Sequence, residues 1–248
     1  MKVPTDKPIS LLFPVYNEED LILKVVNKWI KSVLKKLPPK SEILFDDCSN
    51  DDTPKILKKL CKRNKQLRYH YNKRDGFQNA IKRMAKKAKN DYIFMTDSDG
   101  QYPVNSFWEL YKHMNYFDIV TGFKKIRYDK YYRKILSYFF NTLISFIFFF
   151  KLKNEDYNCF YKIIKRKDFL NLDKKVIYLR KRFPTTEFYL LSEYNNLNIK
   201  RVPIKSLPRG GKKKSNALPI PIILKIVIPT IINLIILRLN IKKNIKKL

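Results

Sequence analysis

The chain has 248 residues, 45% of them apolar, which suits one large α/β domain with an appendage. Its net charge of +31 is extreme, but no helix-turn-helix, zinc or RNA-binding signature accompanies the lysines, so we expect no nucleic-acid partner. Three cysteines without metal-site spacing exclude a disulfide framework and fit a reducing, cytosolic environment, and two isolated histidines argue against a His-based site. The charge indicates attraction to an anionic membrane surface, or simply lysines in solvated positions.

The first half of the chain alternates short apolar runs with stretches of helical periodicity. Residues 9–13 predict a buried strand, and apolar residues at helical spacing over 21–34 predict a helix that ends before Pro38-Pro39. Further strands are expected over 43–45, 67–71, 92–96 and 117–121, and further helices over 54–64, after Gly76 and over 106–114. Strands that alternate with helices form sheets covered by helices, so the predicted fold class is α/β with a mostly parallel central sheet.

Polar clusters follow three of these strands. Residues 16–19 come after the first strand, Asp46 and Asp47 follow the second, and Asp97 and Asp99 follow the fourth. In parallel sheets of this kind, ligands bind at the carboxyl ends of the strands. We therefore expect the three clusters to lie together and to form the site.

The segment Asp97-Ser98-Asp99-Gly100-Gln101 carries the clearest chemistry. Two carboxylates directly after a buried strand contribute little to packing. They suit Mg²⁺ or Mn²⁺, because hard cations take oxygen ligands and keep substrate phosphates in their shell. A solvated Asp-Ser-Asp-Gly turn is the alternative. The other polar clusters at the same sheet edge favour a metal that holds a diphosphate.

The second half contains two strongly apolar segments flanked by basic residues. Residues 135–150 are shorter than the ~20 residues of a membrane span, so we expect either a buried helix or a helix at the membrane interface. Residues 218–239 are interrupted by prolines and by Lys225, whose burial in lipid is costly. We therefore divide the chain into a main domain over 1–216 and an apolar, Lys-flanked, membrane-associating tail over 217–248 with interfacial helices.

Three motifs occur in order along the first half: Pro14-Val15-Tyr16-Asn17-Glu18-Glu19, Asp46-Asp47-x-Ser49-x-Asp51-x-Thr53 and the Asp97–Gln101 segment. Together they resemble family 2 glycosyltransferases of the GT-A fold. Later residues resemble the branch with dolichyl-phosphate mannose synthases and bacterial polyprenyl-phosphate glycosyltransferases; they are Gly122-Phe123-Lys124, Arg133, Ser137, Asn141 and Asp156-x-x-Cys159-Phe160. The resemblance covers residues 9–215 and makes residues 1–216 a catalytic domain. Cys48, Asp75 and Cys159 depart from the family pattern and bear on donor preference.

The resemblance implies a nucleotide-sugar donor, either GDP-mannose or a UDP-hexose. Residues of this chain would form a pocket for the nucleoside, a site for Mg²⁺ or Mn²⁺ and a clamp on the diphosphate. The residues implied are Pro14, Tyr16 and Glu18 around the nucleoside, Asp46 or Asp47 at the base, Asp97 and Asp99 at the metal, Gln101 at the sugar or acceptor, and Arg209 at the diphosphate.

The resemblance also implies a polyprenyl or dolichyl phosphate acceptor, whose phosphate would be held by Lys124, Arg133 and Ser137. A phosphomonoester is largely ionised at neutral pH, so inverting in-line attack on the sugar needs little help from a base. The protein is then a metal-dependent hexosyltransferase at a membrane surface, with its active site facing the cytosol. A membrane-anchoring partner subunit is compatible with the short tail.

Two other functions stay open. The first is a family 2 transferase that acts on a glycan or protein hydroxyl, for which Asp156 or Glu187 is the candidate base. The second is a non-catalytic nucleotide- or anion-binding protein that docks on acidic membranes through its lysines.

Overall fold

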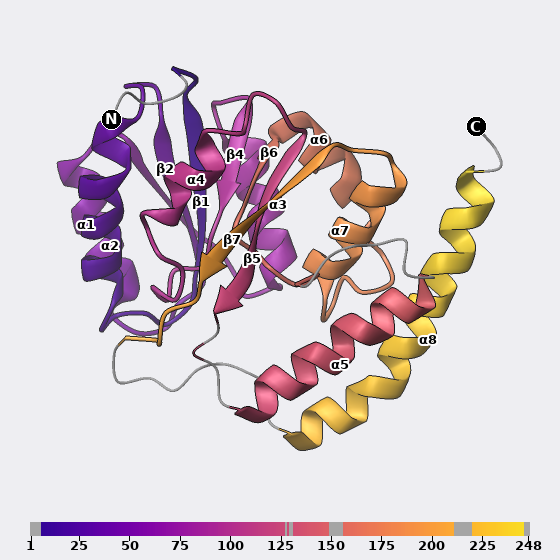
Figure 1. Cartoon of the computed structure of the whole chain (residues 1–248). Helices are drawn as coiled ribbons and strands as arrows, with labels where there is room; N and C mark the ends of the chain where they lie inside the picture. Colours follow the sequence, from indigo (N-terminus) through magenta and orange to yellow (C-terminus); the bar gives the residue numbers. More distant parts are fainter. Residues whose placement is uncertain (1–5, 127, 129–130, 149–155, 211–219, 246–248) are drawn as a thin grey trace.

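The computed structural model describes residues 6–126, 128, 131–148, 156–210 and 220–245. Its centre is a seven-stranded sheet with the order β3-β2-β1-β4-β6-β5-β7 (Figure 1). The strands are β1 (Ile9–Val15), β2 (Glu42–Asp47), β3 (Leu67–Tyr71), β4 (Tyr92–Met95), β5 (Ile119–Ile126), β6 (Lys162–Lys165) and β7 (Ile199–Lys205). The α-helices are α1 (Ile22–Ser32), α2 (Thr53–Arg63), α3 (Phe77–Lys87), α4 (Ser106–Tyr111), α5 (Tyr131–Ile147), α6 (Arg166–Asp173), α7 (Pro184–Tyr194) and α8 (Ile220–Ile245), and the 3₁₀ helix η1 spans Leu34–Lys36.

The first four strands confirm the predicted parallel arrangement. β1 pairs in parallel with β2 and with β4, and β2 pairs in parallel with β3. Alternate residues of β1 enter two separate cores: Leu11 and Phe13 pack on the side of α1 and α4, whereas Leu12 packs on the side of α3 and α7. The sheet is thus covered on both faces, and the carboxyl ends of β1, β2 and β4 share one edge.

Two strands of the second half were not predicted from the sequence. β6 inserts between β4 and β5 and runs antiparallel to both. Its four residues, which begin and end with a lysine, are too few for a periodic signal. β7 pairs in parallel with β5, which begins at Ile119 rather than at 117 and continues to Ile126. Pro203 is accommodated in β7 because that strand lies at the edge of the sheet.

The apolar segment predicted over 135–150 forms α5, which begins earlier, at Tyr131, and ends at Ile147; residues 149 and 150 lie outside the described part. Only Ile144 and Ile147 of this helix are buried, while Tyr138, Phe139 and Phe146 are 63–69% exposed. A fully buried helix, one of the two alternatives, is therefore wrong. The exposed aromatic side chains leave the interfacial alternative.

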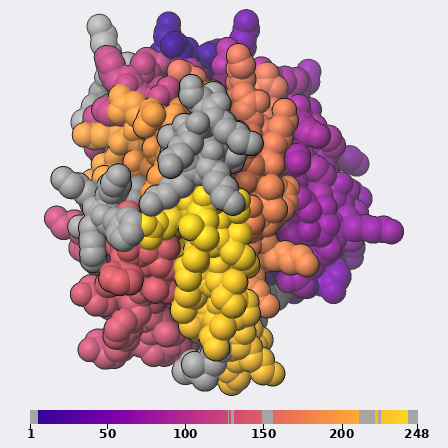
Figure 2. All heavy atoms as spheres, turned by 90° about the vertical axis from the view of Figure 1, so that its right-hand side faces the viewer, coloured from indigo at the N-terminus to yellow at the C-terminus, as the bar shows by residue number. Residues whose placement is uncertain are grey.

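The apolar tail forms α8, which lies beside α5 (Figures 1 and 2). Its buried residues Leu234, Leu237 and Ile241 join the core that α3, α6 and α7 share. Ile228 and Ile232 on the same helix are 68% and 50% exposed. None of the described helices has the length and apolar content needed to cross a membrane. Residues 217–219 and the flanking run Lys212–Lys214 lie outside the described residues.

Candidate functional site

A cavity of about 490 Å³ opens at the carboxyl ends of β1, β2 and β4, and we call it the strand-end cavity. Side chains from several loops meet here, as the polar clusters predicted. Its predicted lining residues are Pro14, Tyr16, Glu18, Asp46, Asp97, Asp99 and Arg209, and they are joined by Val15, Cys48, Arg74, Asp75, Gly76, Phe77, Ala80, Arg83 and Ser98.

The loop after β1 is held in place by the loop after β2. Asn17 adopts a left-handed backbone (φ 54°), and its N–H donates to Ser49 Oγ at 2.7 Å. The N–H of Glu18 donates to Thr53 Oγ1 at 2.9 Å. Ser49 and Thr53 of the second motif therefore shape the site without lining it.

Asp46 and Asp47 have different roles. Asp46 lines the strand-end cavity, whereas the buried Asp47 does not. Asp47 accepts hydrogen bonds from the Ser49 N–H at 2.9 Å and from the Tyr69 hydroxyl at 3.1 Å. Of the two carboxylates predicted for the base, only Asp46 reaches the cavity, because successive residues of a strand point to opposite faces.

Arg83 on α3 links two carboxylates at the rim of the cavity. Its Nε and Nη2 lie 2.9 and 2.8 Å from the two oxygens of Asp46, and its Nη1 lies 2.5 Å from Asp75 Oδ2. Asp75, one of the departures from the family pattern, thereby braces the loop before Gly76, which has a positive φ of 104°. Nearby, the guanidinium of Arg74 lies 3.9 Å from the centre of the Tyr16 ring, a cation–π contact.

Asp97 and Asp99 are the candidate metal ligands. Burial, and then the neighbouring Asp99, raise the pKa of Asp97 to about 7. Gly100, with φ 73°, turns the chain so that the Gln101 N–H donates to Asp99 Oδ1 at 2.9 Å. Among the described residues, no group of three or more His, Cys, Asp or Glu side chains suits a metal by itself. Two neighbouring carboxylates, one of them buried, fit a divalent cation that takes its other ligands from substrate oxygens and water.

Arg209, in the loop after β7, closes the strand-end cavity. Its Nη2 lies 2.6 Å from Glu18 Oε2, and its Nη1 lies 3.6 Å from Asp99 Oδ2. Burial raises the pKa of Glu18, and the hydrogen bond from Arg209 acts against that rise. The predicted diphosphate clamp therefore lies beside both the nucleoside pocket and the metal carboxylates. The next glycine, Gly211, lies outside the described residues.

Gln101 lines neither of the cavities described here. Its backbone carbonyl accepts the Leu207 N–H at 2.7 Å, and its side-chain Nε2 donates to the Leu207 carbonyl at 3.5 Å. These contacts attach the loop that carries Arg209 to the end of β4. The structure thus gives Gln101 a positioning role, and its contact with sugar or acceptor stays a prediction.

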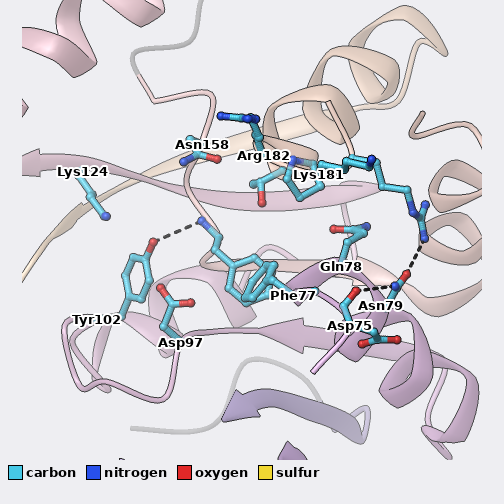
Figure 3. Close-up of a pocket in the computed structure, with 15 residues that line it drawn as sticks. Asp75, Phe77, Gln78, Asn79, Asp97, Tyr102, Lys124, Asn158, Lys181 and Arg182 are labelled. Carbon is cyan, nitrogen blue, oxygen red and sulfur yellow. Dashed lines mark hydrogen bonds between the residues drawn. The ribbon is translucent and has the colours of Figure 1, made fainter. Parts of the chain in front are cut away.

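A second cavity, of about 620 Å³, shares Asp97 and residues 75–77 with the first (Figure 3), and we call it the basic cavity. Lys124 lines it, with Nζ 5.0 Å from the Tyr102 ring centre. The predicted partners of Lys124, Arg133 and Ser137 on α5, line neither of these two cavities. Three cations that the sequence analysis did not single out, Arg180, Lys181 and Arg182, line it instead.

The two candidate bases, Asp156 and Glu187, do not line the basic cavity. The carboxylate of Glu187 is fully buried and accepts the backbone N–H groups of Ile177, Tyr178 and Leu179 at 2.6–3.0 Å. Asp156 is 6% exposed, and its Oδ2 accepts the Lys124 N–H at 3.4 Å. Glu187 holds the loop before α7, so its prediction as a base is replaced by a structural role.

No signal in the sequence marked four of the cavity-lining cations, which are Arg74, Arg83, Lys181 and Arg182. They are four among 53 Lys and Arg residues, and only the folded chain brings them to a cavity. The Asp97–Gln101 segment was identifiable because its chemistry and its position after a strand are both local.

Comparison with known proteins identifies the family. The model of Glycosyl transferase family 2 matches residues 10–180, which is more than half of the chain. An undecaprenyl-phosphate 4-deoxy-4-formamido-L-arabinose transferase of Proteus mirabilis is 30% identical over 141 residues, covering 55% of this chain and 43% of that protein. An uncharacterized protein of Methanocaldococcus jannaschii is 30% identical over 166 residues, covering 62% of this chain and 70% of that protein. The chain thus spans less than half the length of the curated transferase.

Solved structures agree on the fold. Glucosyl-3-phosphoglycerate synthase from Mycobacterium tuberculosis, in complex with Mn²⁺, UDP and glucosyl-3-phosphoglycerate, superposes with a TM-score of 0.68 at 16% identity. The match covers 93% of this chain and 80% of that one. This likeness confirms the predicted GT-A fold with its mostly parallel sheet.

Proposed function

Because this chain belongs to glycosyltransferase family 2, we propose that it transfers a hexose from a nucleoside-diphospho-sugar to a polyprenyl phosphate. One observation carries the proposal: the two cavities share Asp97, with carboxylates and Arg209 on one side and the cations Lys124, Arg180, Lys181 and Arg182 on the other. A donor diphosphate suits the strand-end cavity, and an anionic acceptor suits the basic cavity. Between them, a sugar would lie beside Asp97.

On the donor side, the nucleoside is assigned to the space between Pro14, Tyr16 and Asp46. Arg83 and Asn72 already donate to Asp46, so this carboxylate is oriented before a base arrives. Asp97 and Asp99 would hold Mg²⁺ or Mn²⁺. Such an ion, when bound, neutralises charge on the leaving diphosphate. Arg209 would add a planar guanidinium to the same diphosphate.

The transfer itself is a displacement at the anomeric carbon. An oxygen of the acceptor phosphate forms a bond to C1 of the sugar, and the bond from C1 to the donor diphosphate breaks, so that the nucleoside diphosphate leaves with the electron pair. The configuration at C1 inverts. No proton has to move, because the phosphomonoester is largely ionised above its second pKa of about 6. Positioning and charge stabilisation then supply most of the catalysis.

Both candidate bases are engaged within the fold, which favours a phosphate acceptor over a hydroxyl. A hydroxyl needs a base near its proton, and both candidates, Asp156 and Glu187, accept backbone N–H groups instead. A glycan or protein hydroxyl acceptor is the second candidate function. The position of Lys124 at the basic cavity supports a lipid phosphate as acceptor. The contacts of Arg133 and Ser137 with the acceptor stay predictions.

The membrane is proposed as the place of the reaction, with the active site facing the cytosol. Support comes from the exposed aromatic side chains of α5 and from Ile228 and Ile232 on the neighbouring α8. Apolar side chains on a strongly basic protein suit an interface with anionic lipid. A partner subunit that adds a membrane anchor is compatible with this arrangement.

A radiolabelled transfer assay tests the function. The purified protein is incubated with Mn²⁺ or Mg²⁺, short polyprenyl phosphates and a panel of GDP-mannose, UDP-glucose and UDP-N-acetylglucosamine. Metal-dependent label in the organic phase, absent with Asp99→Ala, is the expected result. Label that reaches only hydroxyl acceptors would replace the lipid phosphate with the second candidate function, and no turnover with any donor or acceptor would contradict both.

A further inference from the structure

The loop between α6 and α7 brings two cations without a carboxylate partner among the described residues to the basic cavity. Lys181 and Arg182 are exposed, line the basic cavity (Figure 3), and have no carboxylate or other side-chain partner among the described residues. Arg180 differs, because it donates to the carbonyls of Asp173 and Val176 and to Asn79 Oδ1 at 3.1–3.2 Å. The guanidinium of Arg180 is thus occupied by hydrogen bonds within the protein, whereas Lys181 and Arg182 are available to a ligand in the cavity.

This loop is held rigidly. The buried Glu187 carboxylate accepts three successive backbone N–H groups at residues 177–179. The Leu179 carbonyl then accepts the N–H groups of Arg182 and Phe183 at 3.0 and 2.8 Å. A buried carboxylate that takes charge-assisted hydrogen bonds fixes the backbone that carries Lys181 and Arg182. The two cations therefore start from a defined backbone position.

A third cavity, of about 250 Å³, lies between this loop and α8. It shares Lys181 and Arg182 with the basic cavity, so the two cations stand between both. Its other lining residues are Ile177, Tyr178, Leu179, Pro229, Thr230 and Asn233. Asn233 Nδ2 donates to the Tyr178 carbonyl at 3.0 Å and fastens α8 to the loop. Ile228 and Ile232 of α8, next in sequence to the lining residues Pro229 and Asn233, are exposed.

We infer that Lys181 and Arg182 bind the phosphate of a prenyl phosphate acceptor, and that its hydrocarbon chain enters the cavity between the α6–α7 loop and α8. This inference rests on the proposed function and names the residues that hold its acceptor. Two adjacent cations match the charge of a phosphate dianion. A mostly apolar cavity on their far side matches the first isoprene units, and the reacting oxygen is then directed toward the sugar beside Asp97.

Binding of geranylgeranyl phosphate to the full chain, measured by calorimetry, tests the phosphate contact. The double variant Lys181→Gln/Arg182→Gln is expected to raise the Kd at least 10-fold. The matched control Lys59→Gln/Lys62→Gln, two exposed lysines of α2, is expected to stay within about twofold of wild type. Geranylgeraniol, which lacks the phosphate, should bind both proteins alike. A double variant that binds the phosphate as tightly as wild type overturns the inference.

Chain length tests the hydrocarbon path. Ile177 is 64% exposed at the rim of the third cavity, so the neutral polar substitution Ile177→Asn is expected to leave the fold intact. This variant is expected to weaken binding of the C20 phosphate at least fivefold and to leave dimethylallyl phosphate unchanged. Equal losses for both lengths, or no loss for either, would contradict a chain in this cavity.

Transfer kinetics separate this inference from the proposed function. The double variant should raise the acceptor KM at least 10-fold, with the donor KM unchanged. Wild type that transfers sugar to prenyl phosphate, together with a double variant of unchanged acceptor KM, leaves the function standing and removes Lys181 and Arg182 from it. Wild type that binds no prenyl phosphate and labels only hydroxyl acceptors overturns both.

Discussion

The guanidinium Nη2 of Arg209 lies 2.6 Å from Glu18 Oε2, although 191 positions separate the two residues along the chain. The other terminal nitrogen, Nη1, lies 3.6 Å from Asp99 Oδ2. One arginine thus joins the loop after β7 to the ends of β1 and β4. This cation lies where a donor diphosphate is proposed to bind.

Replacing Arg209 with alanine is expected to lower kcat roughly 100-fold, because a cation aimed at the leaving diphosphate acts mainly when charge develops there. Steady-state kinetics of sugar transfer measures the loss. Arg63→Ala, an exposed arginine at the end of α2, is the control and should leave kcat unchanged. A kcat within twofold of wild type in Arg209→Ala would remove this residue from the diphosphate site.

Asp99→Asn should abolish the dependence of nucleotide binding on metal. A neutral amide is a weaker ligand for a divalent cation than a carboxylate, so the Kd for nucleoside diphosphate should become the same with and without Mn²⁺. Calorimetry with UDP and GDP gives both values. For wild type we expect at least a 10-fold gain from Mn²⁺, and for the exposed Asp91→Asn control the same gain. A full Mn²⁺ effect in Asp99→Asn would argue against the metal site.

Arg83→Met should destabilise the fold by about 2 kcal/mol, because the nearly buried Asp46 loses its charged partner. The same change frees Asp75 and should weaken nucleotide binding several-fold. Urea unfolding measures the free energy of unfolding, and Lys86→Met on the exposed side of α3 serves as the control. Equal stability of Arg83→Met and Lys86→Met would show that the Asp46–Arg83–Asp75 link is not structural.

Cys48 provides a chemical probe of the strand-end cavity. Burial, and then the charge of Asp47, raise the pKa of its thiol, so the reactive thiolate is scarce at pH 8 and its alkylation rate should still rise above pH 9. UDP or GDP with Mn²⁺ should slow that alkylation at least fivefold. Mass spectrometry follows the modification. Burial raises the pKa of Cys61 and of Cys159 to about 11, so both should react more slowly. No protection by either nucleotide would contradict a nucleoside beside Cys48.

The aromatic side chains on α5 should govern vesicle binding. Tyr138→Asp is expected to weaken binding to anionic phosphatidylglycerol vesicles at least fivefold, because exposed aromatic rings insert at the interface. Co-sedimentation measures the bound fraction. Tyr116→Asp alters an equally exposed tyrosine in the turn between α4 and β5 and is the matched control. Equal losses in both proteins would point to charge alone.

The sequence by itself determined the core of the α/β fold and the candidate metal carboxylates. Strand runs such as 67–71 and the Asp97–Gln101 segment were predictable because their signals, apolar patterning and turn residues, depend only on neighbouring residues. Those signals predicted that Asp46, Asp97 and Asp99 lie at one edge of the sheet, and the resemblance to the family added Arg209.

Tertiary structure alone decided which polar residues reach the cavities. Asp46 lines one and Asp47 does not, because β2 turns them to opposite faces and Tyr69 bonds the second. Lys181 and Arg182 line the basic cavity, and the hydrogen bonds of Glu187 hold the start of their loop against α7. Among 53 basic residues, no local pattern separates a ligand-facing cation from a solvated one, since that difference depends on packing between segments distant in sequence.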